Sequence, residues 1–202
     1  MRTIKFEKML TDLKKTIDRK EIDLLPPYVF SGEVKVIEEA RQVGEAADFL
    51  SRHACLGFDT ETRPAFRKGE IYKVSLLQLA VPDQVFLFRL NKCGFGKELR
   101  DLLSDPVVVK IGVGIRDDLR NLRKSGEFTP ASFVDMQEYA AHFGIEDKSF
   151  SKLMAIIFGV RISKKQRVSN WEAPVLTEAQ IRYAATDAWG ALKMYEKLSS
   201  EA

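Results

Sequence analysis

The chain has 202 residues, of which 45% are hydrophobic and 30% charged, and a formal net charge of +3. This balance is typical of one globular domain with a short appendage, and it excludes a disordered or fibrous protein. No apolar run approaches the roughly 20 residues that span a bilayer, and the charged N-terminus lacks the apolar stretch of a secretory signal. With only Cys55 and Cys93 as thiols, a disulfide scaffold is excluded, and we expect a cytoplasmic protein that does not bind membranes.

Basic residues are concentrated at the N-terminus. Residues 1–20 hold seven basic and three acidic side chains, and apolar residues recur there at helical spacing. The pattern predicts an amphipathic helix in an N-terminal extension over residues 1–30, with a boundary near Pro26 and Pro27. The main domain then covers residues 31–202. The apolar face and positive charge of the extension suit a protein partner, self-association, nucleic-acid contact or packing on the domain.

Strands and helices follow one another along the main domain. We expect a short strand at 34–36, a helix at 41–52, a strand at 54–58, and a hairpin of strands at 72–80 and 84–88 that turns at Pro82. A helix at 97–103, a buried strand at 107–111 and a helix at 115–124 come next. The chain from Phe133 onward is mostly helical and ends in a helix over 177–198, which Thr177 and Gln180 open with a capping box. This order predicts an α/β fold with one central sheet flanked by helices.

Two acidic residues lie where the strand at 54–58 ends. Asp59 and Glu61 are two positions apart, so their side chains share one face of an extended backbone. Two carboxylates on one face can bind a hard dication such as Mg²⁺, which prefers oxygen ligands. Taken alone, the pair is more typical of an ordinary solvated strand end.

Further acidic residues lie in two other segments. Tyr183 and Asp187 are four positions apart in the last predicted helix and share one face, with small residues between them. Asp118 follows the buried strand at 107–111 and a glycine turn, a place where α/β proteins often hold a site. The turn is no dinucleotide-binding fingerprint, because Asp117 occupies the third glycine position.

Taken in this order, the motifs resemble those of the DEDDy branch of the DnaQ-like 3′-5′ exonucleases, and most closely the Werner-syndrome-type exonuclease domain and ribonuclease D. Asp59-Thr60-Glu61 is similar to the first motif of that family, the stretch from 110 to Asp118 to the second, and Tyr183 to Asp187 to the third. The sister branch carries a histidine five positions before its last aspartate, where this chain has Arg182. The resemblance covers about residues 33–198.

The resemblance implies a ribonuclease H-like fold, with a mixed sheet flanked by helices, and a two-metal hydrolytic site. By this resemblance, Asp59 bridges two Mg²⁺ or Mn²⁺ ions, Glu61 and Asp187 bind one of them, and Asp118 serves the other. Tyr183 orients the attacking water. The implied activity is removal of nucleoside 5′-monophosphates from the 3′ end of single-stranded or 3′-recessed nucleic acid. The family includes enzymes for DNA and for RNA, and the Werner-type match favours DNA slightly.

Two basic loops flank these motifs and are expected to contact nucleic-acid phosphates. Their candidate binding residues are Arg63, Arg67, Lys68, Lys73, Lys164, Lys165 and Arg167. Phe66, Tyr72 and Trp171 are candidates for stacking on a base, although core packing is the better interpretation of Trp171. Two alternatives remain: a catalytically silent nucleic-acid-binding or scaffold module of the same fold, and a phosphodiesterase for small nucleotides.

Overall fold

The computed structural model describes residues 13–67 and 69–200 of the chain. Most of the predicted N-terminal helix and the candidate binding residue Lys68 therefore lie outside the described residues. Among the helices that are described, none is both long enough and apolar enough to cross a membrane.

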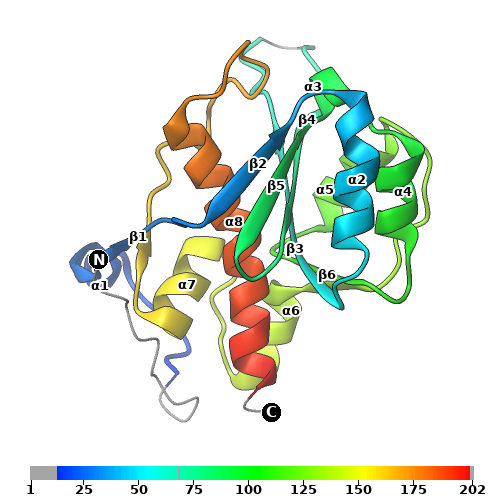
Figure 1. The fold of residues 1–202 in the computed structure, drawn as a ribbon. Helices are drawn as coiled ribbons and strands as arrows, with labels where there is room; N and C mark the ends of the chain where they lie inside the picture. Colours follow the sequence, from blue (N-terminus) through cyan, green and yellow to red (C-terminus); the bar gives the residue numbers. More distant parts are fainter. Residues whose placement is uncertain (1–12, 68, 201–202) are drawn as a thin grey trace.

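A six-stranded mixed sheet forms the centre of the domain (Figure 1). The strand order is β2-β5-β4-β3-β6-β7; β4 is antiparallel to both of its neighbours, and all other pairs are parallel. The strands are β2 (Glu33–Ile37), β3 (Cys55–Thr62), β4 (Val74–Ala80), β5 (Gln84–Arg89), β6 (Val109–Gly112) and β7 (Phe133–Asp135). The predicted α/β class with a mixed sheet is confirmed.

Helices cover both faces of this sheet (Figure 1). Helices α2 (Ala40–Leu50), α4 (Lys97–Ser104) and α5 (Arg116–Arg123) lie on one face, and α8 (Glu178–Ser199) lies across the other. Alternate residues of β4 face the two layers: Leu77 and Leu79 pack with α2 and α4, whereas Leu76 and Ala80 pack with α8. Both faces are covered, which is why β4 and β5 are buried along their whole length.

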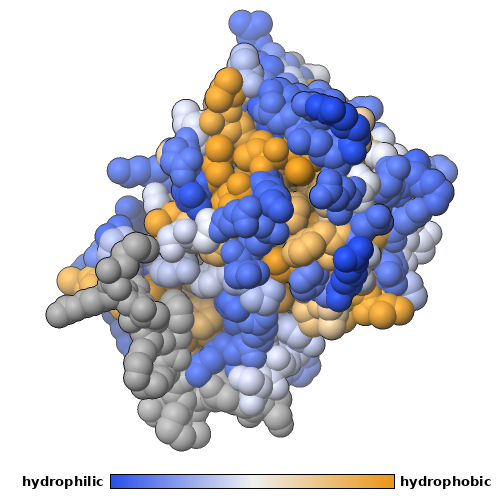
Figure 2. Space-filling model, in the orientation of Figure 1, coloured by the Kyte–Doolittle hydropathy of each residue, from blue (hydrophilic) through white to orange (hydrophobic). Residues whose placement is uncertain are grey.

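Smaller elements complete the domain around α8. Helix α7 (Phe150–Phe158) packs against α8, and β1 (Pro27–Tyr28) pairs in parallel with β8 (Arg161–Ile162) in a separate two-stranded sheet. The remaining short elements are α1 (Arg19–Leu24), α3 (Leu90–Cys93), α6 (Met136–Tyr139) and a 3₁₀ helix (Ala140–Phe143). On the face seen in Figure 2, hydrophobic residues gather in the upper half, with hydrophilic residues around them.

The predicted N-terminal helix is wrong for the part of it that the structure describes. Residues 13–18 are not helical, and α1 begins only at Arg19, after an N-cap at Asp18. The backbone of this segment pairs with a distant loop instead: the Ile17 N–H donates to Asp147 (2.8 Å), and the Lys15 carbonyl accepts from the Glu146 N–H (2.8 Å). Tertiary hydrogen bonds and burial of Ile17 thus override the helical pattern.

Most other predicted elements are confirmed, with shifted ends. The 84–88 and 72–80 strands pair around the turn at Pro82, and the capping box of Thr177 and Gln180 opens α8. The strand predicted at 107–111 begins later, at Val109, because Val107 is 79% exposed and its N–H donates to the Asp105 side chain. The short strands β1, β7 and β8 were not predicted, because two or three residues carry no detectable alternation.

Candidate active site

Strand β3 carries the first two candidate ligands within its length. Asp59 lies opposite Gln78 and Glu61 opposite Leu76 on β4, and the register shifts directly after Glu61. Because cross-strand partners share a face, Glu61 lies on the same side of the sheet as Leu76, which packs in the α8 layer. Asp59 shares that side, being two residues away. Both carboxylates therefore face α8.

Helix α8 brings Tyr183 and Asp187 to these carboxylates by an unusually close approach to β3. Gly57 makes this approach possible, because a Cβ at this position would lie only 2.0 Å from the carbonyl oxygen of Ala188. The facing helix residues Ala184, Ala185 and Ala188 are small and buried. Asp59, Glu61 and Asp187 each place one carboxylate oxygen within 4.8 Å of the other two. The predicted convergence of β3 and the last helix is thus present in the structure.

Asp118 lies at the edge of this group. It is in the first turn of α5, where its Oδ1 accepts a hydrogen bond from the hydroxyl of Thr60 (2.5 Å). Its charge raises the pKa of both Asp59 and Glu61, so it is close to them, but it is not part of the compact set of three. The neighbouring Asp117 is exposed and pairs with Arg120 instead (3.1 Å).

The turn before α5 is held by Asp135, at the end of β7. Its carboxylate accepts the backbone N–H groups of Gly114 (2.9 Å), Ile115 (3.1 Å) and Gln137 (2.9 Å). Gly114 has a φ of +70°, a conformation that favours glycine. Asp135 thereby fixes the start of the helix that presents Asp118. The sequence analysis missed this residue, because its partners are distant backbone groups that no motif reveals.

The four carboxylates have raised pKa values because they are crowded in a partly water-excluded site. Burial is the largest cause for each of them. The pKa of Asp59 is well above its usual range, and burial with repulsion from Asp187 and Asp118 raises that of Glu61 to about 9. The pKa of Asp187 rises to about 7 and that of Asp118 to about 6. Such a group binds divalent cations readily, because the cations remove the repulsion. An all-oxygen set of this kind fits Mg²⁺ or Mn²⁺.

Tyr183 points its hydroxyl toward the same group. The hydroxyl lies close to Asp187, one helical turn further on, where its O–H favours the ionised carboxylate and so opposes the rise in the pKa of Asp187. Burial, followed by the negative charges of Asp187, Glu61 and Asp59, raises the pKa of Tyr183 far above its usual value. The phenol therefore stays protonated and can serve as a hydrogen-bond donor at the site.

The first predicted basic loop lies between β3 and β4 and is only partly free to bind phosphates. Arg63 forms an ion pair with Glu172 (3.3 Å), and its guanidinium lies over the ring of Tyr72 (4.7 Å). Arg67 and Lys73 are exposed. Of the stacking candidates in this loop, Phe66 is 79% exposed. The engagement of Arg63 with a carboxylate was not predicted.

The second predicted basic loop lies beside α8. Lys164 and Arg167 line a cavity that also reaches Tyr183 and Asp187. Lys165 lines a neighbouring cavity on Tyr183. The positive charge of Arg167 lowers the pKa of Glu61, which shows that this guanidinium lies near the carboxylate group. The two loops thus lie next to different parts of the site: the first follows β3, and the second lies beside α8.

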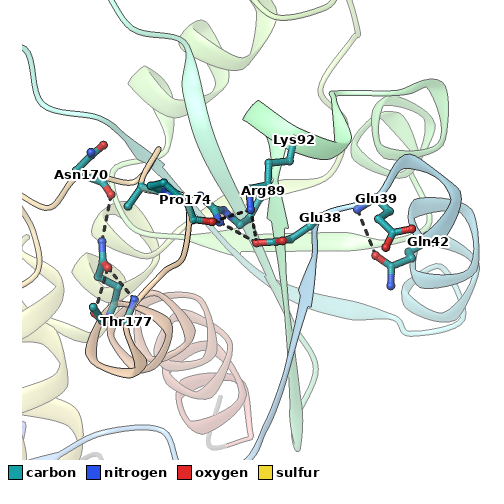
Figure 3. Close-up of polar contacts among 10 residues, drawn as sticks. Glu38, Glu39, Gln42, Arg89, Lys92, Asn170, Pro174 and Thr177 are labelled. Carbon is teal, nitrogen blue, oxygen red and sulfur yellow. Dashed lines mark hydrogen bonds and ion pairs between the residues drawn. The ribbon is translucent and has the colours of Figure 1, made fainter.

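A buried arginine fastens the segment between this loop and α8. Arg89 is fully buried and donates to the carbonyl oxygens of Ala173 and Pro174 (Figure 3). It also pairs with Glu38 (2.8 Å), which accepts from Lys92 as well (2.9 Å). The sequence analysis missed this contact, for which a charged residue at the end of the apolar strand β5 was the available signal.

The fastened segment carries Trp171, which is completely buried and so does not stack on a base. Its ring centroid lies 6.1 Å from that of Tyr183. Trp171 is therefore part of the core that supports the site, as the packing interpretation predicted.

Comparison with known proteins agrees with this arrangement. A 3′-5′ exonuclease family model matches residues 34–202. The chain is 31% identical over 188 residues to the mouse bifunctional 3′-5′ exonuclease/ATP-dependent helicase WRN, covering 88% of this chain and 13% of that protein. It is 34% identical over 153 residues to ribonuclease D of Gluconacetobacter diazotrophicus, covering 74% of this chain and 38% of that protein. It thus spans only a minor part of either relative's length.

The fold also has solved counterparts. The crystal structure of Escherichia coli RNase D superposes with a TM-score of 0.76 at 24% sequence identity, over 84% of this chain and 45% of that one. The likeness at this level of identity concerns the fold, which is ribonuclease H-like as predicted. Together with the family match over most of its length, these findings show that the chain belongs to the 3′-5′ exonuclease family.

Proposed function

We propose that this enzyme removes nucleoside 5′-monophosphates from the 3′ end of nucleic acid in a metal-dependent hydrolysis. The observation that carries the proposal is the convergence of Asp59, Glu61 and Asp187, with carboxylate oxygens within 4.8 Å of one another. We assign the activity to a domain over residues 31–202, with residues 1–30 as an N-terminal extension that contacts the domain or a partner.

The four carboxylates would hold two Mg²⁺ or Mn²⁺ ions, with Asp59, Glu61 and Asp187 as the central ligands and Asp118 at the edge. Ions in such a site offset the charge of the reacting phosphate and lower the pKa of water. The mutual repulsion that adds to burial in raising the pKa values of Asp59 and Glu61 supports this assignment. The donor set contains oxygen only, as these hard cations prefer.

Tyr183 and Asp187 position the attacking water in this proposal. The protonated phenol has one O–H, which would turn from Asp187 to the water oxygen once the carboxylate of Asp187 is engaged in metal binding. The water oxygen forms a bond to phosphorus while the bond between phosphorus and the 3′ oxygen breaks. The 3′ oxygen leaves with a proton, and the released nucleotide keeps its 5′ phosphate.

The substrate is single-stranded or 3′-recessed nucleic acid, whose phosphates would contact Arg67, Lys73, Lys164, Lys165 and Arg167. We propose a slight preference for DNA. It is supported by the match to the WRN relative, which extends over 88% of this chain, compared with 74% for the ribonuclease D.

Single strands of DNA and RNA, labelled at either the 3′ or the 5′ end, test this function with Mg²⁺, Mn²⁺ or EDTA. We expect a ladder that shortens from the 3′ end, requires the metal and is lost in Asp59→Ala. Asp117→Ala is the matched control, because it also removes one carboxylate but an exposed one that pairs with Arg120. Intact substrates that still shift in a gel would support the silent binding module. Cleavage limited to very short oligomers would support a phosphodiesterase for small nucleotides.

A further inference from the structure

A small cavity adjoins the candidate active site on the side of α7. Its volume is about 160 Å³. It lies between the first turn of α7, the second basic loop and the middle of α8. Its polar lining comes from Ser149, Ser151, Ser163, Lys164, Arg167, Tyr183 and Asp187. Through the last two residues it is continuous with the carboxylate group.

The start of α7 presents hydrogen-bond donors to this cavity. The helix has nine residues, and its N-cap Ser149 makes no side-chain capping bond. The first N–H groups of a helix have no partner within the helix, and the helix dipole places partial positive charge there. Anions bind at such ends when other donors complete the site.

Ser151 supplies an independent sign of a ligand. Its side chain is buried, with 5% of the residue exposed, and its hydroxyl oxygen has no hydrogen-bond partner among residues 13–67 and 69–200. Buried hydroxyls are nearly always paired, so an unpaired one that lines a cavity indicates a group that is bound there during function.

Two cations face the same space. Lys164 and Arg167 are exposed, and neither forms an ion pair with a carboxylate among the residues that the structure describes. Asp187 is the only carboxylate on the cavity wall within that part of the chain. The lining therefore combines two positive side chains, four hydroxyls and a helix N-terminus, a donor set suited to a phosphate group.

We propose that this cavity binds the phosphate of the nucleotide next to the scissile bond, on its 5′ side. The proposal rests on the proposed function, because the reacting phosphate itself must lie at the carboxylate group. A strand whose 3′ end lies there passes Tyr183 with its next phosphate beside Ser151, Lys164 and Arg167. The cavity would then hold the strand in register for release of one nucleotide.

Ser151→Ala tests this proposal, with Ser125→Ala as the matched control. Both serines have a buried hydroxyl without a partner in the described part of the chain, but Ser125 lines a different cavity, which Asp187 does not reach. Each substitution should raise the melting temperature, because an unpaired buried polar group is removed. Only Ser151→Ala should weaken binding of an oligonucleotide, by about 10-fold, as expected for losing a hydrogen bond to a charged group.

Binding is measured by fluorescence anisotropy in EDTA, so that no turnover is needed. A neutral methylphosphonate at the second linkage from the 3′ end should weaken binding to the wild type but cause no further loss with Ser151→Ala. A methylphosphonate three linkages further from that end is the control and should weaken both proteins equally. Equal effects of the second-linkage substitution on wild type and variant would overturn the proposal.

Measuring hydrolysis of two kinds of substrate distinguishes a failure of this proposal from a failure of the proposed function. The p-nitrophenyl ester of thymidine 5′-monophosphate has a single phosphate, so Ser151→Ala should hydrolyse it at the wild-type rate while losing activity on oligonucleotides. Equal loss on both substrates would show that the cavity serves the reacting phosphate and would refute the proposal. If the wild type cleaves neither substrate with Mg²⁺ or Mn²⁺, the proposed function fails, and the binding measurements still decide the phosphate site.

Discussion

Gly57→Ala is expected to separate the two halves of the active site. The new methyl group would lie 2.0 Å from the carbonyl oxygen of Ala188, 2.8 Å from its carbonyl carbon and 3.2 Å from the Cβ of Ala80. Since the position of a Cβ is fixed by its own backbone and the facing oxygen is a backbone atom, no side-chain rotation can relieve this contact. Helix α8 must move away from β3 by about 1 Å or more, and Asp187 moves with it. A displacement of this size at a reacting centre costs about 100-fold in rate.

The assay is the rate of nucleotide release from a 3′-labelled DNA strand at saturating metal, together with thermal unfolding. We expect kcat to fall about 100-fold and the free energy of unfolding to fall by about 1–3 kcal/mol through overpacking. Gly44→Ala is the matched control, because Gly44 lies in α2 and a Cβ added there would have no neighbouring atom within 4 Å. It should gain about 0.5–1 kcal/mol of stability at unchanged kcat. A wild-type kcat in Gly57→Ala would refute the close-approach argument.

Three further predictions concern the groups around the carboxylates. In the metal-free folded protein, the carboxylates with raised pKa values keep protons that the unfolded chain releases near about pH 4. The folded state therefore loses stability as the pH rises, and its melting temperature in EDTA should fall up to about pH 9, the approximate pKa of Glu61. Asp59→Asn should flatten this slope, and an unchanged slope would argue against the repulsion. Tyr183→Phe should lower kcat about 100-fold through loss of a water-positioning donor with KM unchanged; a full rate would remove the phenol from the mechanism. Asp135→Ala should lower the free energy of unfolding in urea by about 1–3 kcal/mol, because it leaves backbone N–H groups unpaired, and should lower kcat through Asp118; wild-type stability would contradict its positioning role.

The sequence predicted the site better than it predicted the chain around it. Asp59 and Glu61 lie on one face because strand periodicity requires it, and Tyr183 and Asp187 because helical periodicity does. Local periodicity alone did not predict that these two segments lie side by side; the family resemblance implied that. The resemblance selected Asp118 over Asp117, whereas local geometry required only that one of the two face the site, because helical neighbours point in different directions.

What the sequence did not reveal depends on contacts between distant segments. Asp135 accepts hydrogen bonds from backbone N–H groups about twenty residues earlier in the chain. Arg89 donates to a carbonyl oxygen 85 residues later in the chain, beyond α7 in the sequence. Residues 13–18 have a helical sequence pattern but are not helical, because their backbone forms hydrogen bonds with the loop that contains Asp147. Such interactions carry no periodicity and become visible only in three dimensions.

The central claim is that the four carboxylates form a site for two divalent ions, and counting bound Mn²⁺ by calorimetric titration tests it most directly. The account predicts two ions for the wild type and for Asp117→Ala, and loss of this binding in Asp187→Ala, with melting temperature reporting that the variant is folded. Wild-type Mn²⁺ binding in a folded Asp187→Ala protein, or no Mn²⁺ binding by the wild type, would contradict it.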